Sequence, residues 1–238
     1  DSGDVQSAIS KYQWILERKP NYIEARGNLA LALKVLGRYE AAIVEYERTF
    51  EVIRTSVIEF HMADTLLTLG RFEQGWESYE SRWHIDPLDK FEWPFEEKDK
   101  LWDGQKDKKI VLWKEQGIGD DILFLSLVPE VFKISRTLSV YTDPRLIPLC
   151  GRSMPDINFL PDEKTLKNEI FDYHLPMGSL PRLFRNSEKD FDRAIRGYLK
   201  ADPKRVELLR DELGLKEKRV VGISWKSIKA KNKLKKNM

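Results

Sequence analysis

A short turn motif recurs three times in the first third of the chain, at spacings of 34 and 33 residues. Gly3, Gly37 and Gly70 are each followed by a charged residue and then by an apolar one. Five positions after each glycine stands a small residue, and nine positions after it stands a tyrosine: Ala8, Ala42 and Gly75, then Tyr12, Tyr46 and Tyr79. A period of this length is built from two antiparallel helices and a turn, so it restricts this part of the chain to stacked helical hairpins.

The period and the two registered positions are the signature of tetratricopeptide repeats. The small residue lets two antiparallel helices approach closely, and the tyrosine fills the space between neighbouring hairpins. Pro20 and Pro87 stand 17 positions after the first and third glycines, where proline ends a helix. The pattern predicts five helices, over 4–19, 21–36, 38–53, 55–69 and 71–83.

The first repeat lacks the helix that should precede the turn at Gly3. The helix after that turn would then expose an apolar stripe, namely Ile9, Tyr12, Ile15 and Leu16. This suggests a longer protein cut short at its N-terminus, and it predicts self-association because exposed apolar patches promote it. The repeats could hold a protein partner, but two and a half repeats make a poor binding groove.

Residues 86–107 differ in character and are predicted to be a linker between two domains. Pro87 and Pro94 break helices, and aromatic residues crowd into this stretch: Phe91, Trp93, Phe95 and Trp102. Such aromatics can pack a linker onto the end of the repeats. The alternative is an aromatic platform for a sugar or a base.

Short apolar runs that alternate with helical patterns occupy residues 108–225, which predicts an α/β domain with a mostly parallel sheet. The expected strands cover 109–113, 138–142, 157–160, 171–175 and 219–225. Ligands of such sheets bind at the carboxyl ends of the strands. Segments 115–120, 174–179 and 225–227 each follow a strand end, so we expect them to converge.

The sequence Gly117-Ile118-Gly119-Asp120-Asp121 joins the first of these strands to an amphipathic helix. Glycines permit tight turns and close backbone approach, and a helix N-terminus offers free N–H groups. The loop lacks the third glycine of a dinucleotide-binding fingerprint and the Lys of a P-loop. Each of Asp120 and Asp121 could cap the helix, or could act as a general base toward a hydroxyl.

Other reactive residues indicate little chemistry. His174 either forms a hydrogen bond at the sheet rim or contacts a ligand. Cys150 is expected to be an inert buried thiol, and Ser179 and Ser224 have no base at a readable spacing. With one cysteine and three scattered histidines, we expect no metal site and no disulfide.

The net charge of +2 comes from the end of the chain, because residues 226–238 contain six lysines and no acid. The rest of the chain is mildly acidic, so we interpret this stretch as a solvated tail rather than a nucleic-acid-binding patch. No apolar run reaches the roughly 18 residues of a membrane span, and no signal peptide opens the chain. Together with the single cysteine, this predicts a cytoplasmic protein.

Four motifs in order resemble a bacterial family, and the resemblance covers nearly the whole chain. They are Trp102-Asp103-Gly104, Glu115-Gln116-Gly117-Ile118-Gly119-Asp120, Asp172-Tyr173-His174-Leu175-Pro176 with Ser179-Leu180-Pro181, and Gly222-Ile223-Ser224-Trp225. Members carry tetratricopeptide repeats ahead of a glycosyltransferase-like region related to the heptosyltransferases of glycosyltransferase family nine. The resemblance implies two Rossmann-like halves, with a nucleotide-sugar donor in the second, acceptor groups in the first, and no further cofactor.

The resemblance also implies roles for single residues. Asp120 matches the acid taken to activate the acceptor, and the expected substrate contacts are Gln116, Gly117, Gly119, Asp121 and His174. Lys226 and Ser227 could touch the donor phosphates. Only thirteen residues follow Trp225, so the usual donor-binding half is absent and we expect the chain to be an inactive fragment of a glycosyltransferase. The alternative is a non-catalytic tetratricopeptide scaffold.

Overall fold

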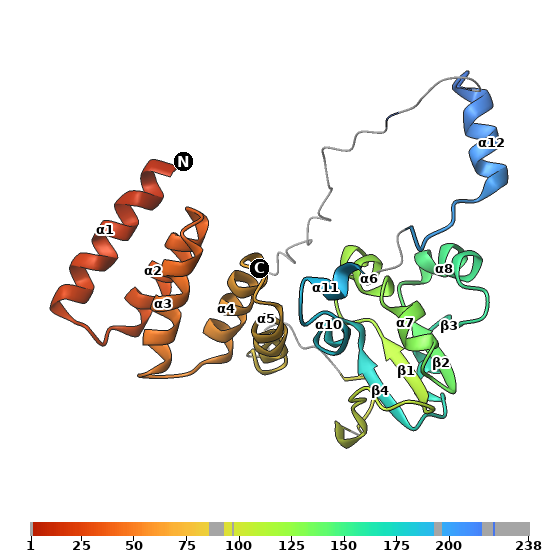
Figure 1. Ribbon diagram of the computed structural model, residues 1–238, viewed down its shortest axis with the longest axis horizontal. Helices are drawn as coiled ribbons and strands as arrows, with labels where there is room; N and C mark the ends of the chain where they lie inside the picture. The colour runs from red at the N-terminus through yellow and green to blue at the C-terminus, as the bar shows by residue number, and fades with distance from the viewer. Residues whose placement is uncertain (1, 86–92, 97, 193–196, 216–220, 222–238) are drawn as a thin grey trace, which may run out of the picture. The chain divides into compact units, whose positions relative to one another are not determined.

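The computed structural model describes residues 2–85, 93–96, 98–192, 197–215 and 221. The chain divides into two units, Asp1–Lys200 and Ala201–Met238. The second unit contains α12 (Pro203–Glu212), which follows the cap residue Asp202 and ends just before Gly214. All other elements belong to the first unit (Figure 1).

Helical hairpins form the first part of the chain, as predicted. The helices are α1 (Ser2–Arg18), α2 (Ile23–Val35), α3 (Tyr39–Phe50), α4 (Ser56–Thr68) and α5 (Phe72–Tyr79), and a 3-10 turn, η1 (Glu80–His84), continues α5. Each helix packs on the next one along the chain. Gly37 and Gly70 stand at the turns with φ of 72° and 74°, a conformation that only glycine adopts at no steric cost.

The core of the hairpins contains the small residue and the tyrosine that define the repeat. Ala42 and Tyr46 are fully buried, together with Leu29, Ala30, Leu33, Ile43 and Leu66. Burial raises the pKa of the Tyr46 phenol to about 12. The predicted exposed stripe on the first helix is wrong for Ile9, which is 1% exposed because α1 packs along α2. Tyr12 and Leu16 also pack against this core.

Gly75 on α5 lies where this helix packs tightly against α4, so a larger residue there should destabilise the hairpin. A Cβ at this position would lie 2.7 Å from Cδ2 of Leu67 and 3.1 Å from its backbone nitrogen. We expect Gly75→Val to lower the free energy of unfolding by about 1–3 kcal/mol in a urea titration. The control is Gly27→Ala on α2, where a Cβ meets nothing within 4 Å and the added helix propensity should give a gain of up to about 1 kcal/mol. Equal effects of the two substitutions would contradict this packing.

A four-stranded parallel sheet follows the hairpins, in agreement with the predicted alternation. Its strands are β1 (Lys109–Trp113), β2 (Thr137–Tyr141), β3 (Asn158–Leu160) and β4 (Tyr173–Pro176), in the order β3-β2-β1-β4. Leu112 lies opposite Val140 on one side and Leu175 on the other. The predicted strand over 219–225 lies outside the described residues except for Val221.

Short helices follow the strands. They are α6 (Ile118–Leu125), α7 (Val128–Phe132), η3 (Pro144–Leu146), α8 (Ile147–Ser153), α9 (Glu163–Lys167), η4 (Met177–Ser179), α10 (Leu180–Phe184) and α11 (Lys189–Asp192), and η2 (Lys98–Lys100) precedes the sheet. The amphipathic helix expected after the glycine loop is divided into α6 and α7, and Pro129 stands in the first turn of α7. Proline fits there because the first turn needs no N–H donor.

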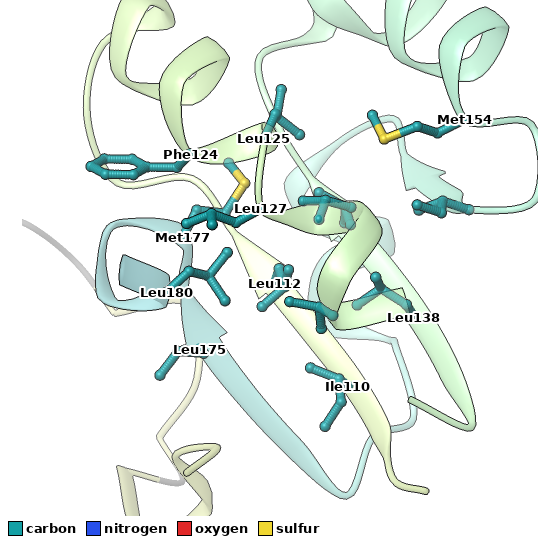
Figure 2. Packing of buried hydrophobic residues seen from close by; sticks show 14 of the residues in the cluster. Ile110, Leu112, Phe124, Leu125, Leu127, Leu138, Met154, Leu175, Met177 and Leu180 are labelled. Atoms are coloured by element: carbon teal, nitrogen blue, oxygen red, sulfur yellow. The ribbon is translucent and has the colours of Figure 1, made fainter. Parts of the chain in front are cut away.

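The two faces of the sheet have different coverings. Ile110 and Leu112 of β1 point into a cluster built with α6, α7, α8 and α10 (Figure 2). Val111 and Trp113 point to the opposite face, where they pack with Tyr141, Leu160, Leu166 and Phe95. Because both faces are covered, β1 is apolar along nearly its whole length.

The aromatics of the predicted linker pack mainly on the sheet. Trp93 contacts Trp83 at the end of the hairpins, with ring centroids 4.8 Å apart, as the linker interpretation predicts. It also contacts Trp113 of β1 at 5.4 Å. Phe95 covers the same face, whereas Trp102 is buried in the cluster on the opposite face. Phe91 and Pro87 lie outside the described residues.

Candidate functional site

The glycine loop leaves the carboxyl end of β1 and opens α6, with Asp120 in its first turn. Oδ2 of Asp120 accepts a hydrogen bond from the backbone N–H of Gly117 at 3.1 Å. A Cβ on Gly117 would lie 3.4 Å from that oxygen, which is close to ordinary van der Waals contact. Asp120 is half-buried and Gly119 is exposed, with nothing within 4 Å of the place where a Cβ would stand. The loop therefore leaves room for a ligand beside Asp120.

Asp121 has a different environment, and this separates the two acids that the sequence left equivalent. It is 2% exposed, and its Oδ2 accepts hydrogen bonds from the Thr142 hydroxyl at 2.8 Å and from the Asp143 N–H at 3.0 Å. Burial raises the pKa of Asp121, and the two hydrogen bonds oppose that rise. Asp121 thus ties α6 to the end of β2, and its position inside the domain does not favour the predicted substrate contact.

Gln116 is exposed and contacts the last helical hairpin. Its side-chain amide donates to the Tyr79 hydroxyl at 2.6 Å. Burial raises the pKa of the Tyr79 phenol, and the hydrogen bond from Gln116 and the charge of Arg82 oppose that rise. Tyr79, which the repeat pattern marks as a packing residue, therefore also lies beside the loop.

His174 is 0% exposed and belongs to the aromatic layer on the sheet. Its Nδ1 accepts a hydrogen bond from Nε1 of Trp113 at 3.1 Å, and its ring lies 4.8 Å from that of Phe95. This is the hydrogen-bonding role that the sequence analysis gave as one alternative. A ligand would have to displace these aromatic rings to reach the imidazole, so the geometry does not support the predicted substrate contact.

A buried ion cluster, which no pattern in the sequence predicts, joins the end of the hairpins to the sheet. Arg82 of η1 donates from Nε and Nη2 to the two carboxylate oxygens of Glu115, at 2.9 and 3.0 Å. Nη1 donates to Glu80 at 2.7 Å, and Nη2 also donates to the Ser179 hydroxyl at 2.8 Å. The side chains of Arg82 and Glu115 are only 7% and 4% exposed. Arg82 and Glu115 are 33 residues apart, and no sequence pattern predicts an ion pair at that separation.

Two of the three segments expected to converge do so. Glu115 follows β1, Gly178 and Ser179 follow β4, and Arg82 contacts both groups. The strand order reverses between β1 and β4, and the crevice at such a reversal is the usual ligand position in open α/β sheets. Here the Arg82 guanidinium lies at that position. The third segment, 225–227, lies outside the described residues, as do Lys226 and Ser227.

An open cavity of about 390 Å³ lies at the carboxyl ends of β1 and β2, next to the glycine loop. Its volume is within the range of small-molecule sites. Its walls combine aromatic and charged side chains: Trp93, Pro94, Trp113, Lys114, Glu115, Gln116, Tyr141, Glu163, Leu166 and Lys167. Glu115 and Gln116 belong both to this cavity and to the loop that leads to Asp120.

Cys150 is expected to resist alkylation in the folded protein. It is fully buried, and burial raises the pKa of its thiol to about 11. Only the thiolate reacts, so labelling by iodoacetamide at pH 7 should be at least roughly 100-fold slower than in the urea-unfolded chain. Mass spectrometry of timed samples measures both rates, and equal rates would contradict the burial of this side chain.

No group of three or more His, Cys, Asp and Glu side chains is arranged to hold a metal ion within the part of the chain that the structure describes. Among the same residues, no helix combines the length and apolarity that crossing a membrane requires.

The fold and the loop thus define a class of protein in which helical hairpin repeats precede a parallel α/β domain. No family model matches the chain. The chain is similar to protein FlbA of Caulobacter vibrioides (strain ATCC 19089 / CIP 103742 / CB 15), with 28% identity over 255 aligned residues. The alignment covers 95% of this chain and 41% of FlbA, so the chain spans about two-fifths of the length of that relative. Among solved structures, it is similar to an O-GlcNAc transferase mutant of Thermobaculum terrenum, with a TM-score of 0.34 and 13% identity over 59% of this chain and 34% of that one.

Proposed function

We propose that this chain belongs to a glycosyltransferase in which tetratricopeptide-type repeats precede the acceptor-binding half of a two-Rossmann fold, with Asp120 as the general base. The observation that carries the proposal is the contrast between the two neighbouring acids. Asp120 is half-buried beside an open glycine, whereas Asp121 is enclosed and held by two hydrogen bonds. This contrast supports Asp120, rather than Asp121, as the acid that would meet a hydroxyl of a bound acceptor.

The reaction that fits this arrangement is an inverting sugar transfer. The acceptor oxygen attacks the anomeric carbon of a nucleotide sugar, and the bond from that carbon to the diphosphate breaks. Asp120 takes the proton of the attacking hydroxyl, and the nucleoside diphosphate departs as an anion that needs stabilisation by donor-side groups. We assign that task to a second Rossmann-like half, with Lys226 and Ser227 as the first contacts to the phosphates.

The mixed character of the open cavity supports an acceptor site on this half. Aromatic faces and both signs of charge line it, and Gln116 connects it to the loop before Asp120. Under this proposal the domain limits are 1–85 for the repeats, 86–107 for the linker, 108–225 for the acceptor half and 226–238 for a Lys-rich tail. The protein would act in the cytoplasm.

The test is a transfer assay with two chains: the 238 residues alone, and a longer chain that adds a donor-binding half. Each is incubated with a panel of nucleotide sugars, and nucleoside diphosphate release is measured with and without Asp120→Asn. We expect release from the longer chain that depends on Asp120, and none from the 238 residues. Release that does not depend on Asp120, or none from either chain, would favour the non-catalytic scaffold.

A further inference from the structure

We propose that the last helical hairpin contributes residues to the candidate site. In this proposal Arg82 is a positioning residue that holds the loop leading to Asp120. The role given to the loop rests on the proposed function, whereas the attachment of the loop to the hairpin does not. The proposal depends on the contacts of Arg82 and Tyr79 with two consecutive loop residues, Glu115 and Gln116.

The guanidinium is fixed by its own hairpin before it reaches the sheet. Nη1 donates to the Tyr79 carbonyl at 3.1 Å and to Glu80 at 2.7 Å. Its carbon atom lies 4.4 Å from the ring centroids of both Tyr79 and Trp83. The remaining donors, Nε and Nη2, form a two-point contact with the Glu115 carboxylate, which sets both position and orientation.

The α/β domain is shaped to receive this contact. A Cβ at Gly178 would lie 1.9 Å from Oε1 of Glu115, so the carboxylate occupies space that only glycine leaves free. The next residue, Ser179, donates its hydroxyl to Glu80 and accepts from Nη2 of Arg82. The cluster therefore spans η1, the end of β1 and the turn after β4.

A cluster of this kind is a poor source of stability, which points to a positional role. Burying the Glu115 carboxylate and the Arg82 guanidinium costs about as much free energy as their attraction returns, and an apolar replacement of similar volume is often as stable. Removing only the cation is different, because Glu115 would stay buried without its counter-ion. It would then take up a proton or turn outward, and Gln116 would move with it.

The path from hairpin to candidate base is short. Glu115 and Gln116 are each attached to the hairpin, and Gly117 begins the next helix with its N–H bonded to Asp120. Displacement of the hairpin by a partner on the repeats would therefore change the position of Asp120 directly. A merely structural arginine would have no such local effect.

The test is amide hydrogen exchange of the 238-residue chain, measured by NMR, which needs no substrate. The reporters are the amides of Gly117 and Asp121, and the reference is the amide of Lys114, which donates to the Tyr141 carbonyl. We expect Arg82→Gln to speed exchange of the reporters by about 10-fold more than that of the reference. Without the arginine, the loop can open by a local fluctuation that leaves the rest of the domain folded. Arg82→Lys should give an intermediate effect, since an ammonium cannot form the two-point contact.

The matched control is Arg185→Gln, which breaks the ion pair of another buried arginine, with Glu130 of α7, and neither residue belongs to the loop. This variant should change the exchange rates of the reporters and of the reference by the same factor. Gly178→Ala should reproduce the effect of Arg82→Gln while Arg82 is still present. If Arg82→Gln does not fold, Gly178→Ala and Tyr79→Phe supply the same comparison.

The proposal is overturned if the reporters in the folded Arg82 or Gly178 variants respond no more than the reference, or no more than in Arg185→Gln. This outcome is independent of the transfer assay. Suppose that the reporter amides exchange faster when Arg82 is replaced, but that the rate of sugar transfer does not depend on Asp120. The positioning role of Arg82 would then stand, and the glycosyltransferase proposal would be rejected. If sugar transfer depends on Asp120 but the Arg82 variants show no local effect on exchange, the glycosyltransferase proposal would stand and the positioning role would be rejected.

Discussion

Asp120→Asn is expected to lower the rate of sugar transfer by about 10²–10⁴-fold in a chain that contains the donor half, the usual range for loss of a general base. Asparagine has nearly the same size, and its carbonyl oxygen can still accept the hydrogen bond that Asp120 takes from the Gly117 N–H. The free energy of unfolding should therefore change by less than about 0.5 kcal/mol. The loss should appear in turnover measured by product formation.

Asp121→Asn provides the control, with the opposite pair of results. The amide oxygen of asparagine can accept from both the Thr142 hydroxyl and the Asp143 N–H, because both bonds end on the single oxygen Oδ2, but its NH₂ group would be buried in place of Oδ1. We expect a loss of about 1–3 kcal/mol in the free energy of unfolding and near-normal turnover below the melting temperature. A large loss of turnover in Asp121→Asn with none in Asp120→Asn would exchange the two roles. Normal turnover in both would make each acid a structural residue only.

Leu112→Ala is expected to lower the free energy of unfolding by about 2–5 kcal/mol, measured by urea titration. Leu112 is fully buried in the central strand β1, with Val140 and Leu175 as its register partners. It faces the cluster in Figure 2, where α6 and α10 supply Leu125 and Leu180. Truncation removes buried apolar surface and leaves a cavity that the close packing cannot fill.

The control for this experiment is Leu123→Ala on α6, a leucine that is 61% exposed. Its truncation should change the free energy of unfolding by no more than about 0.5 kcal/mol. Similar losses at positions 112 and 123 would mean that β1 does not lie at the centre of the sheet.

The repeat pattern was sufficient for the hairpins because the information is local and periodic. Ala42, Tyr46 and Gly75 of the repeat pattern all lie in the packing between helices, so the spacing along the chain reports that packing directly. The prediction that Ile9 is exposed was wrong because a local, periodic pattern carries no information on how two helices overlap. The pattern counts the repeats, but it does not show how far α2 covers α1.

The strands could be located because each is a short apolar run between turn residues, and a strand such as β1 must be apolar when both of its faces are buried. Which aromatics cover which face could not be read. Trp93, Phe95 and Trp102 stand within ten positions of one another, yet Trp102 packs on one face of the sheet and the other two on the opposite face. That choice depends on the path of the chain between them.

At the candidate site, local sequence was enough to identify the glycine loop and to place Asp120 at the start of a helix, because glycines and acids have strong preferences there. It could not separate Asp120 from Asp121, since the difference depends on Thr142 and Asp143 at the end of another strand. Nor could it reveal Arg82, which meets Glu115 and Ser179 only after the hairpin packs on the sheet. Helices, strands and turns follow from interactions between near neighbours in the chain, whereas the environment of a charge depends on groups that folding brings from far along it.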